Sequence, residues 1–283
     1  MVDLVIISSN VKEILQKSAQ IYKARGRLDP DEFDRHVSFH TYAPPADLAL
    51  FIEHFWTIQW DKTGSTYTSE EVMHRPYVDV FMSLQETGVQ GTFRGKRAYV
   101  AAETGRVVGI RFRPGGFRAF WDGSLTDLQD KIIEAQQVFP QISQVYVQRL
   151  LLLEDEAIVH ELTELLRAKH PKLDNNIELI NKIIAAVEND DSLLTVKAVG
   201  KASGRSERWL QQLFQGYVGI GLKWFLQRHK LLRAAEQIRE NSDLNWVDLA
   251  YDLGYSSQQH FITDFKKVLG KTPLQYRKEL TSN

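Results

Sequence analysis

Two different periodicities divide the chain near its middle. From about residue 36 to residue 102, short segments alternate apolar and polar positions, as in HFWTIQW (His54–Trp60) and YVDVFMSL (Tyr77–Leu84). Such a period of two, interrupted by glycines, is typical of strands. Beyond Pro114 the apolar positions recur every three or four residues, which predicts helices. The pattern therefore indicates an α+β chain with a β-rich N-terminal part followed by an all-α C-terminal part.

These patterns predict four segments. An amphipathic stretch at 10–25 and the polar turn after it predict a helix and a linker within 1–35. Residues 36–142 form the β-rich domain, which we interpret as a sensor or dimerisation domain, and 143–173 form a helical linker. Asp174 can cap the next helix, so the all-α domain is expected to span 174–283.

The last hundred residues contain an internal repeat. In each copy a short helix runs into a glycine turn, and a serine (Ser206 in the first copy, Ser256 or Ser257 in the second) then caps another helix. Glycine suits the left-handed residue that ends a helix, and serine accepts hydrogen bonds at a helix start. This order predicts two helix-turn-helix units, joined by a helix at about 222–240. The copies are offset by 50 at the first glycine and by 51 afterwards, as shown by Gly204 and Gly254, Leu210 and Phe261, Phe214 and Phe265, and Gly219 and Gly270.

The second helix of each unit has a polar face opposite its apolar face. Glutamine and arginine can form paired hydrogen bonds with adenine and guanine edges in the major groove of DNA. Two such helices about 34 Å apart could enter successive grooves. A helical bundle with solvated polar faces is the alternative, which the repetition disfavours. The polar positions are Glu207, Arg208, Gln211 and Gln212 in the first copy and Gln258, Gln259, Thr263 and Lys266 in the second.

The stretch LAYDLGYSSQQHFITDFKKVLGKTPLQYRK (Leu249–Lys278) resembles the C-terminal signature of the AraC/XylS family of bacterial transcription regulators. The resemblance covers about 174–278 and implies a seven-helix DNA-binding domain with two units. The family often has arginine where this chain has Gln212 and Thr263, so the resemblance implies no particular operator sequence. It implies base-reading roles for Arg208, Gln211 and Gln212 in the first unit and for Gln258, Gln259 and Thr263 in the second.

Charge is distributed unevenly along the chain. Residues 196–283 hold 14 Lys+Arg and 8 Asp+Glu, a net charge of +6, which leaves 21 and 28 in the remainder, a net charge of −7. An acidic N-terminal part and a basic C-terminal part indicate two separate roles. Lys266, Lys267 and Lys271 are candidates for phosphate contacts. Glu207 and Asp264 place acids on or near the same helices.

The segments YAPPADLALFIEHFWTIQW and VVGIRFRPGGFRAFW resemble an N-terminal domain that recurs on regulators of this family. This resemblance implies an architecture but no ligand. A β domain rich in aromatic residues can form an apolar pocket. Trp56, Trp60 and Tyr77 are candidates for the wall of such a pocket. The alternative is that each is an ordinary core residue.

The motif RFRPGG places two arginines beside a forced turn. Arg111 and Arg113, next to backbone N–H groups at a helix start, are candidates for holding an anionic ligand. The alternative is a structural turn whose arginines pair with acids such as Glu103.

The sequence argues against several kinds of chemistry. The chain has no cysteine, which excludes disulfides and cysteine nucleophiles, and with them the Ada-type alkyl-DNA repair enzymes that share this DNA-binding domain. His40, His54 and His74 are scattered, without the His-x-His pair usual in cupin metal sites, so no metal is predicted. No phosphate loop or nucleophile elbow occurs. The chain is therefore not expected to be an enzyme or to need a cofactor.

Together these features predict a sequence-specific DNA-binding transcription regulator whose N-terminal domain senses a small molecule or mediates dimerisation. Double-stranded DNA is the expected partner, and a small-molecule effector, RNA polymerase and a second copy of the chain are further candidates. No apolar run approaches about 20 residues and the start MVDLVIISSN lacks signal-peptide features, so a cytoplasmic location without a membrane partner is expected. A helical protein-interaction module and an unrecognised enzyme in the β-rich domain are the alternatives.

Overall fold

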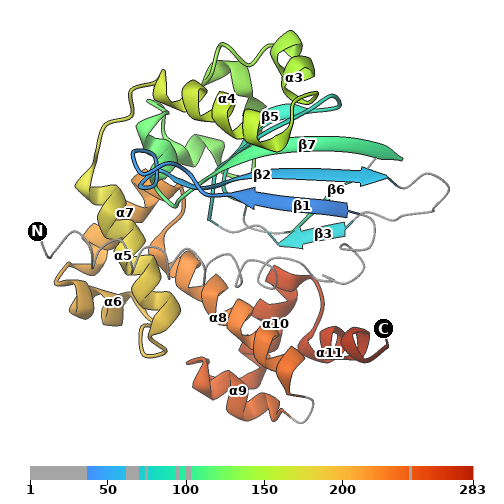
Figure 1. Cartoon of the computed structure of the whole chain (residues 1–283). Helices are drawn as coiled ribbons and strands as arrows, with labels where there is room; N and C mark the ends of the chain where they lie inside the picture. The colour runs from blue at the N-terminus through green and yellow to red at the C-terminus, as the bar shows by residue number, and fades with distance from the viewer. Residues whose placement is uncertain are drawn as a thin grey trace, which may run out of the picture.

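The structure, a computed structural model, describes residues 37–61, 70–73, 76–93, 96–99, 103–241 and 244–282. The predicted N-terminal helix and linker (1–35) and His74 lie outside these residues. Within the described part, a β-rich domain precedes a helical domain, and the two lie against each other (Figure 1). This arrangement confirms the predicted α+β fold class.

An antiparallel six-stranded sheet forms the centre of the N-terminal domain, with the strand order β1-β2-β7-β4-β5-β8. The predicted alternation is clearest in β4, where Val80 and Met82 are fully buried and Phe81 is half-buried. Strands β3 and β6 pair separately. The strands are β1 (Val37–Tyr42), β2 (Ile52–Asp61), β3 (Glu70–Met73), β4 (Asp79–Ser83), β5 (Thr87–Gln90), β6 (Lys96–Tyr99), β7 (Thr104–Phe112) and β8 (Ile132–Glu134).

The segment after Pro114 corrects the expectation that α-helices begin there. It forms three 3-10 helices, η1 (Gly116–Ala119), η2 (Leu125–Leu128) and η3 (Ala135–Gln137), and strand β8, which pairs with β5 at the sheet edge. Gly115 has a left-handed backbone, φ 81°, which an α-helix does not accept. Leu125 and Leu128 are both buried, and a spacing of three fits a 3-10 turn as well as an α-helix.

Helices α3 (Gln144–Leu150) and α4 (Asp155–Arg167) pack on the sheet rather than forming a linker (Figure 1). Asp155 fixes α4 to two strands, because its carboxylate accepts hydrogen bonds from Thr57 Oγ1 at 2.8 Å and from Arg106 Nη2 at 2.5 Å. The two helices of the segment 143–173, predicted as a helical linker, therefore belong to the core of the β domain. The helices pack there because the apolar face that their helical period predicts is buried against the sheet. One hydrophobic cluster contains residues of the strands together with Val147, Leu150, Ile158, Leu162, Leu165 and Leu166.

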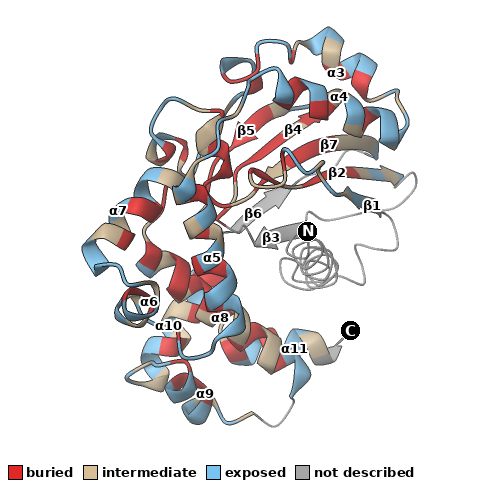
Figure 2. Ribbon diagram, turned by 60° about the vertical axis from the view of Figure 1, so that its left-hand side comes forward, coloured by how far each residue is buried: buried red, intermediate tan, exposed pale blue. Residues whose placement is uncertain are grey.

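The helical domain has two cores joined by one long helix. One core lies among α5, α6, α7 and the first half of α8, and the other among the second half of α8, α9, α10 and α11. Figure 2 shows buried residues along the inner sides of these helices. The long helix matches the predicted connection. The helices are α5 (Asn175–Asn189), α6 (Val196–Ser203), α7 (Glu207–Val218), α8 (Leu222–Glu240), α9 (Trp246–Asp252), α10 (Gln258–Leu269) and α11 (Pro273–Ser282).

Candidate nucleic-acid interface

The first helix-turn-helix unit consists of α6, a glycine turn and α7. Thr195 Oγ1 caps α6 by accepting from Ala198 N–H at 3.1 Å. Gly204 ends α6 with φ 66°, a left-handed conformation that glycine adopts without a steric penalty. Ser206 Oγ then caps α7 by accepting from Trp209 N–H at 3.2 Å. The turn is therefore built by the residues that the sequence predicted.

The second unit repeats this construction with α9 and α10. Asn245 Oδ1 caps α9 by accepting from Val247 N–H at 2.9 Å, and Gly254 in the turn has φ 73°. Of the two serines left open by the sequence, Ser257 is the cap of α10, accepting from His260 N–H at 3.3 Å. Ser256 Oγ lies 3.0 Å from His260 Nδ1 instead. Both units thus start their second helix in the same way.

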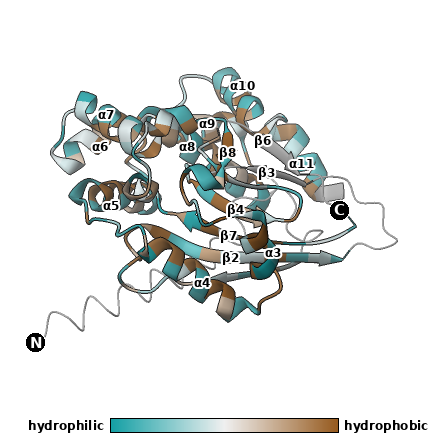
Figure 3. Cartoon of the chain, turned by 90° about the horizontal axis from the view of Figure 1, so that it is seen from above, coloured by the Kyte–Doolittle hydropathy of each residue, from teal (hydrophilic) through white to brown (hydrophobic). Residues whose placement is uncertain are grey.

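The second helices, α7 and α10, bury one face and expose the other. Leu210 and Phe214 in α7, and Phe261 and Phe265 in α10, are fully buried. Seen from above, α7 and α10 lie on the side of the molecule opposite β2 (Figure 3). We call α7 and α10 the first and second reading helices, since their exposed faces carry the predicted base-reading residues.

Most of the predicted base-reading side chains lie on these exposed faces. Arg208 and Gln212 are exposed on α7, and Gln259 and Thr263 occupy the equivalent positions, 51 residues on, in α10. Gln211 is half-buried and its Oε1 faces Gly221, where a Cβ atom would lie 2.6 Å from it.

Gln258 and Thr263 differ in how available they are. Gln258 is half-buried at the first position of α10, close to the apolar side. Thr263 Oγ1 donates to its own helix, to Gln259 O at 2.9 Å. The geometry therefore gives Arg208, Gln212 and Gln259 the best access to a groove.

Sequence reasoning missed two side chains on the same faces. Gln215 is exposed one turn beyond Gln212, at the position equivalent to Lys266 in α10. The offset of 51 was the signal that would have found it. Arg205, exposed in the turn before α7, stacks its guanidinium 5.0 Å from the centre of the Trp209 ring. Such a cation beside the second helix of a helix-turn-helix unit is suited to a phosphate contact.

The predicted phosphate-contacting lysines are not equivalent. Lys266 and Lys267 are exposed in the last turn of α10. Lys271 is half-buried and forms an ion pair with Glu279 of α11. Asp264, an acid that the sequence placed near this surface, accepts a hydrogen bond from Gln227 Nε2 of α8 at 2.6 Å. The positive charge of the second reading helix is therefore concentrated in Lys266 and Lys267.

In the N-terminal domain, Arg111 already has an anionic partner. Its Nε and Nη2 each donate to Asp79 at 2.8 Å, across the pairing of β7 with β4. Burial lowers the pKa of Arg111 to about 9 and raises that of Asp79, and this two-point contact offsets the cost of burying both charges. Arg113 Nε donates to Ala49 O at 2.8 Å. Of the two arginines proposed for an anionic ligand, Arg111 thus joins β7 to β4, with Asp79 rather than Glu103 as the acid. Arg113 holds the turn that precedes β2.

The three aromatic residues proposed for the wall of an apolar pocket lie in two separate places. Trp56 and Trp60 of β2 lie over Gly109 and Gly105, their neighbours on β7. Cβ atoms added to these glycines would lie 2.4 and 2.3 Å from the two indole rings. Tyr77 lies elsewhere, with its ring 5.3 Å from the Arg111 guanidinium carbon. The three aromatics therefore do not line one pocket in this conformation.

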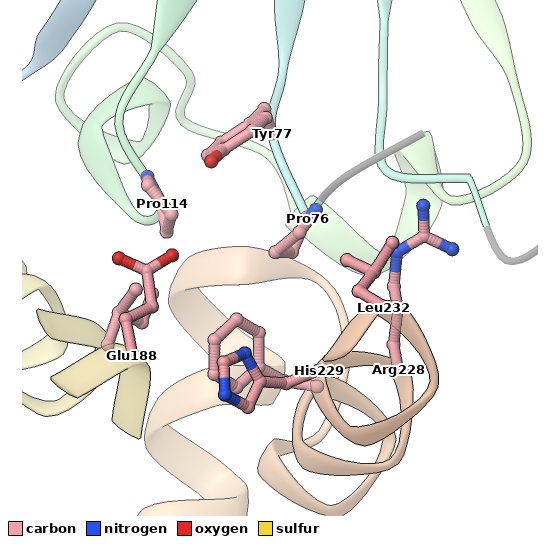
Figure 4. Close-up of a pocket in the computed structure, with 9 residues that line it drawn as sticks. Pro76, Tyr77, Pro114, Glu188, Arg228, His229 and Leu232 are labelled. Carbon is pink, nitrogen blue, oxygen red and sulfur yellow. The ribbon is translucent and has the colours of Figure 1, made fainter. Parts of the chain in front are cut away.

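Tyr77 does line a small cavity between the two domains (Figure 4). Pro76 and Pro114 of the β domain face Arg228 and His229 of α8 across it, and both α8 side chains are buried. Its volume of about 30 Å³ holds one or two water molecules. In this conformation it is too small for a metabolite.

Within the described residues, no cluster of three or more histidine or acidic side chains is arranged to hold a metal ion. The same part of the chain contains no helix that is both long and apolar enough to span a bilayer.

Comparison with known proteins adds family evidence. Residues 199–279 match a family described as a helix-turn-helix domain, and residues 40–134 match one described as a domain of unknown function. The regulatory protein SoxS of Escherichia coli K12 is 35% identical over 104 residues, which cover 36% of this chain and 96% of SoxS.

Two further matches are more partial. The F1 operon positive regulatory protein of Yersinia pestis is 34% identical over 100 residues, which cover 35% of this chain and 33% of that protein. Among solved structures, the C-terminal domain of the response regulator AraT from Geobacillus stearothermophilus aligns at 25% identity with a TM-score of 0.32, covering 35% of this chain and 84% of that domain.

Proposed function

Because this chain belongs to the AraC/XylS family of DNA-binding transcription regulators, we propose that its two reading helices enter two successive major-groove segments on one face of a DNA duplex. One observation carries this proposal: two helix-turn-helix units with a serine cap on the second helix, a glycine turn and matching buried positions are joined by the single helix α8. At 19 residues, α8 is roughly 28 Å long. That length is comparable to one DNA turn of about 34 Å.

Within this arrangement, Arg208 and Gln259 are our main candidates for reading bases. They occupy equivalent positions in the first turns of α7 and α10, and both side chains are exposed. Arginine pairs best with guanine and glutamine with adenine. Gln212 and Gln215 extend the polar face of the first reading helix, and Lys266 and Lys267 follow the phosphate backbone beside the second.

The N-terminal domain is proposed to regulate this binding. Its cavity beside α8 and its contacts with α7 give it a direct physical connection to both the connecting helix and the first reading helix. An effector that binds the two conformations of the protein unequally would shift DNA affinity by that difference. Dimerisation through the same domain and contact with RNA polymerase are further parts of the proposal, as is action in the cytoplasm.

Footprinting of genomic fragments with the purified full-length chain tests the proposal. It should reveal a preferred site, and Arg208→Ala and Gln259→Ala should each relax specificity by about 1–3 kcal/mol at one base position. The two positions should lie about 10 base pairs apart. Arg149→Ala, which removes an exposed arginine of α3 paired with Glu161, is the matched control and should change nothing. If both substitutions weaken all sequences equally, Arg208 and Gln259 contact phosphates and the base assignments are wrong.

A further inference from the structure

The two reading helices end differently. Both stop at a left-handed glycine, Gly219 with φ 85° and Gly270 with φ 77°. Helix α10 closes its last turn with its own backbone, because Gly270 N–H donates to Lys266 O at 2.7 Å. At the end of α7, the carbonyl of Val218 accepts a hydrogen bond from Thr92 Oγ1 at 2.9 Å. Thr92 belongs to the N-terminal domain, 126 residues away in the sequence.

Thr92 is held firmly for this contact. It is 2% exposed and follows the end of β5. Asp130 N–H donates to Thr92 O at 2.9 Å, and the preceding Gly91 N–H donates to Lys131 O at 3.1 Å. The loop after η2 thus fixes the backbone that carries the Thr92 side chain. A side chain on such a backbone can act as a preorganised cap.

A second set of contacts places the same end of α7 against the β domain. A Cβ atom on Gly219 would lie 2.6 Å from Leu125 O of η2, so only glycine allows this approach. Tyr217 packs its Cβ beside the Gly115 turn, at 3.6 Å from a Cβ built there. The Tyr217 hydroxyl donates to Asp174 Oδ2 at 2.6 Å and accepts from Asn176 Nδ2 at 2.8 Å. The glycine turn of the RFRPGG motif therefore lies against the first reading helix.

From this asymmetry we propose that Thr92 is a positioning residue for the first reading helix: beside Gln215 of α7 itself, which donates to Gly219 O at 3.3 Å, the N-terminal domain supplies a cap to Val218 O and so sets the angle of α7 in the groove. The second reading helix caps itself. This inference rests on the proposed DNA-binding function. It assigns the N-terminal domain a selective effect, on the bases read by the first unit and not on those read by the second.

Thr92→Val in the full-length chain tests the proposal, because valine keeps the branched shape and removes only the hydroxyl. Loss of this one hydrogen bond should weaken binding to the preferred site about 3- to 10-fold. Discrimination should fall at the base position assigned to Arg208 and stay unchanged at the position assigned to Gln259. Thr87→Val is the matched control, since the Thr87 hydroxyl donates to Ser83 O within the β4–β5 hairpin and contacts no reading helix.

Hydrogen exchange provides a readout that does not depend on DNA. Peptides covering the end of α7 should exchange faster in Thr92→Val than in the unsubstituted chain, whereas peptides covering the end of α10 should not. Thr92→Ser, which keeps the hydroxyl, should restore both exchange and discrimination. Unchanged exchange in a folded Thr92→Val protein would overturn the inference, and so would a folded Thr92→Ser variant that behaves like Thr92→Val. If the unsubstituted chain prefers no DNA sequence, the proposed function fails, while the exchange comparison still decides whether the cap exists.

Discussion

Replacing Gly219 by alanine should destabilise the protein far more than the same replacement at Gly204. Both glycines end the helix before them in a left-handed conformation, with φ 85° and 66°. They differ in what surrounds them. An added Cβ at Gly204 meets no atom within 4 Å, whereas at Gly219 it would lie 2.6 Å from Leu125 O and 3.1 Å from Leu125 C. The pair therefore separates the backbone penalty from the contact between the domains.

The magnitudes follow from these two terms. A left-handed alanine costs about 1–2 kcal/mol relative to glycine, and this term is common to both variants. Forcing extra atoms into a packed site costs typically about 1–3 kcal/mol more. We therefore expect a loss of about 1–2 kcal/mol in the free energy of unfolding for Gly204→Ala and about 2–5 kcal/mol for Gly219→Ala. The blocking atom is a backbone carbonyl in η2, which cannot turn aside as a flexible side chain would.

Urea unfolding of the two full-length variants, followed by tryptophan fluorescence, measures the difference through the shift in midpoint. Titration with the preferred DNA site then shows whether the displaced helix still binds. Equal midpoints for the two variants would refute the reasoning, because the end of α7 would then not be pressed against η2 in solution.

Two other outcomes are expected. Replacing both Lys266 and Lys267 by alanine should reduce the magnitude of the slope of log affinity against log salt concentration by about 2, since each phosphate contact releases close to one counterion. Lys271→Ala is the control: the Lys271 side chain is paired with Glu279, so this variant should change the slope much less. Equal slopes for all variants would contradict the assignment. Burial raises the pKa of the Asp155 carboxyl, but the hydrogen bonds that it accepts outweigh burial and hold its pKa below the usual value, so its contribution to stability is present at neutral pH and lost as the pH falls below about 4. Asp155→Asn should therefore lower the unfolding midpoint at pH 7 by an amount that shrinks as the pH is lowered below about 4, and a midpoint difference that does not depend on pH would rule out this linkage.

The helical domain could be predicted from sequence because its signals are local. Gly204, Ser206, Gly254 and Ser257 each act within one or two turns of helix, and their repetition at a nearly constant offset made the second unit a check on the first. Even so, the sequence could not tell which glutamines face outward. Gln211 is drawn toward Gly221, which is a consequence of how α8 follows α7.

The contacts of the β domain were harder to predict because the residues that form them are distant in sequence. The pairing of Arg111 with Asp79 depends on β4 lying next to β7, which no local pattern states. Strand β8 has only three residues and a half-buried pattern, so alternation cannot distinguish it from a turn. The contact of Thr92 with Val218 joins a loop in one domain to a helix end in the other. Only the folded chain brings such groups together.

Helix α8, shared by the two cores, also fixes a phase between them. Phe225 and Leu226 belong to the first core, and Leu231 and Ala234 belong to the second. One residue inserted between these pairs would turn the second unit by about 100° and move it by about 1.5 Å. An insertion of seven residues, close to two full turns, would nearly restore the rotation but lengthen the helix by about 10.5 Å. Over that length DNA itself rotates by roughly 110°, at about 34 Å and 10 base pairs per turn. Because the pitches of the protein and DNA helices differ, neither insertion would leave the second unit facing DNA as it does at the present length of α8.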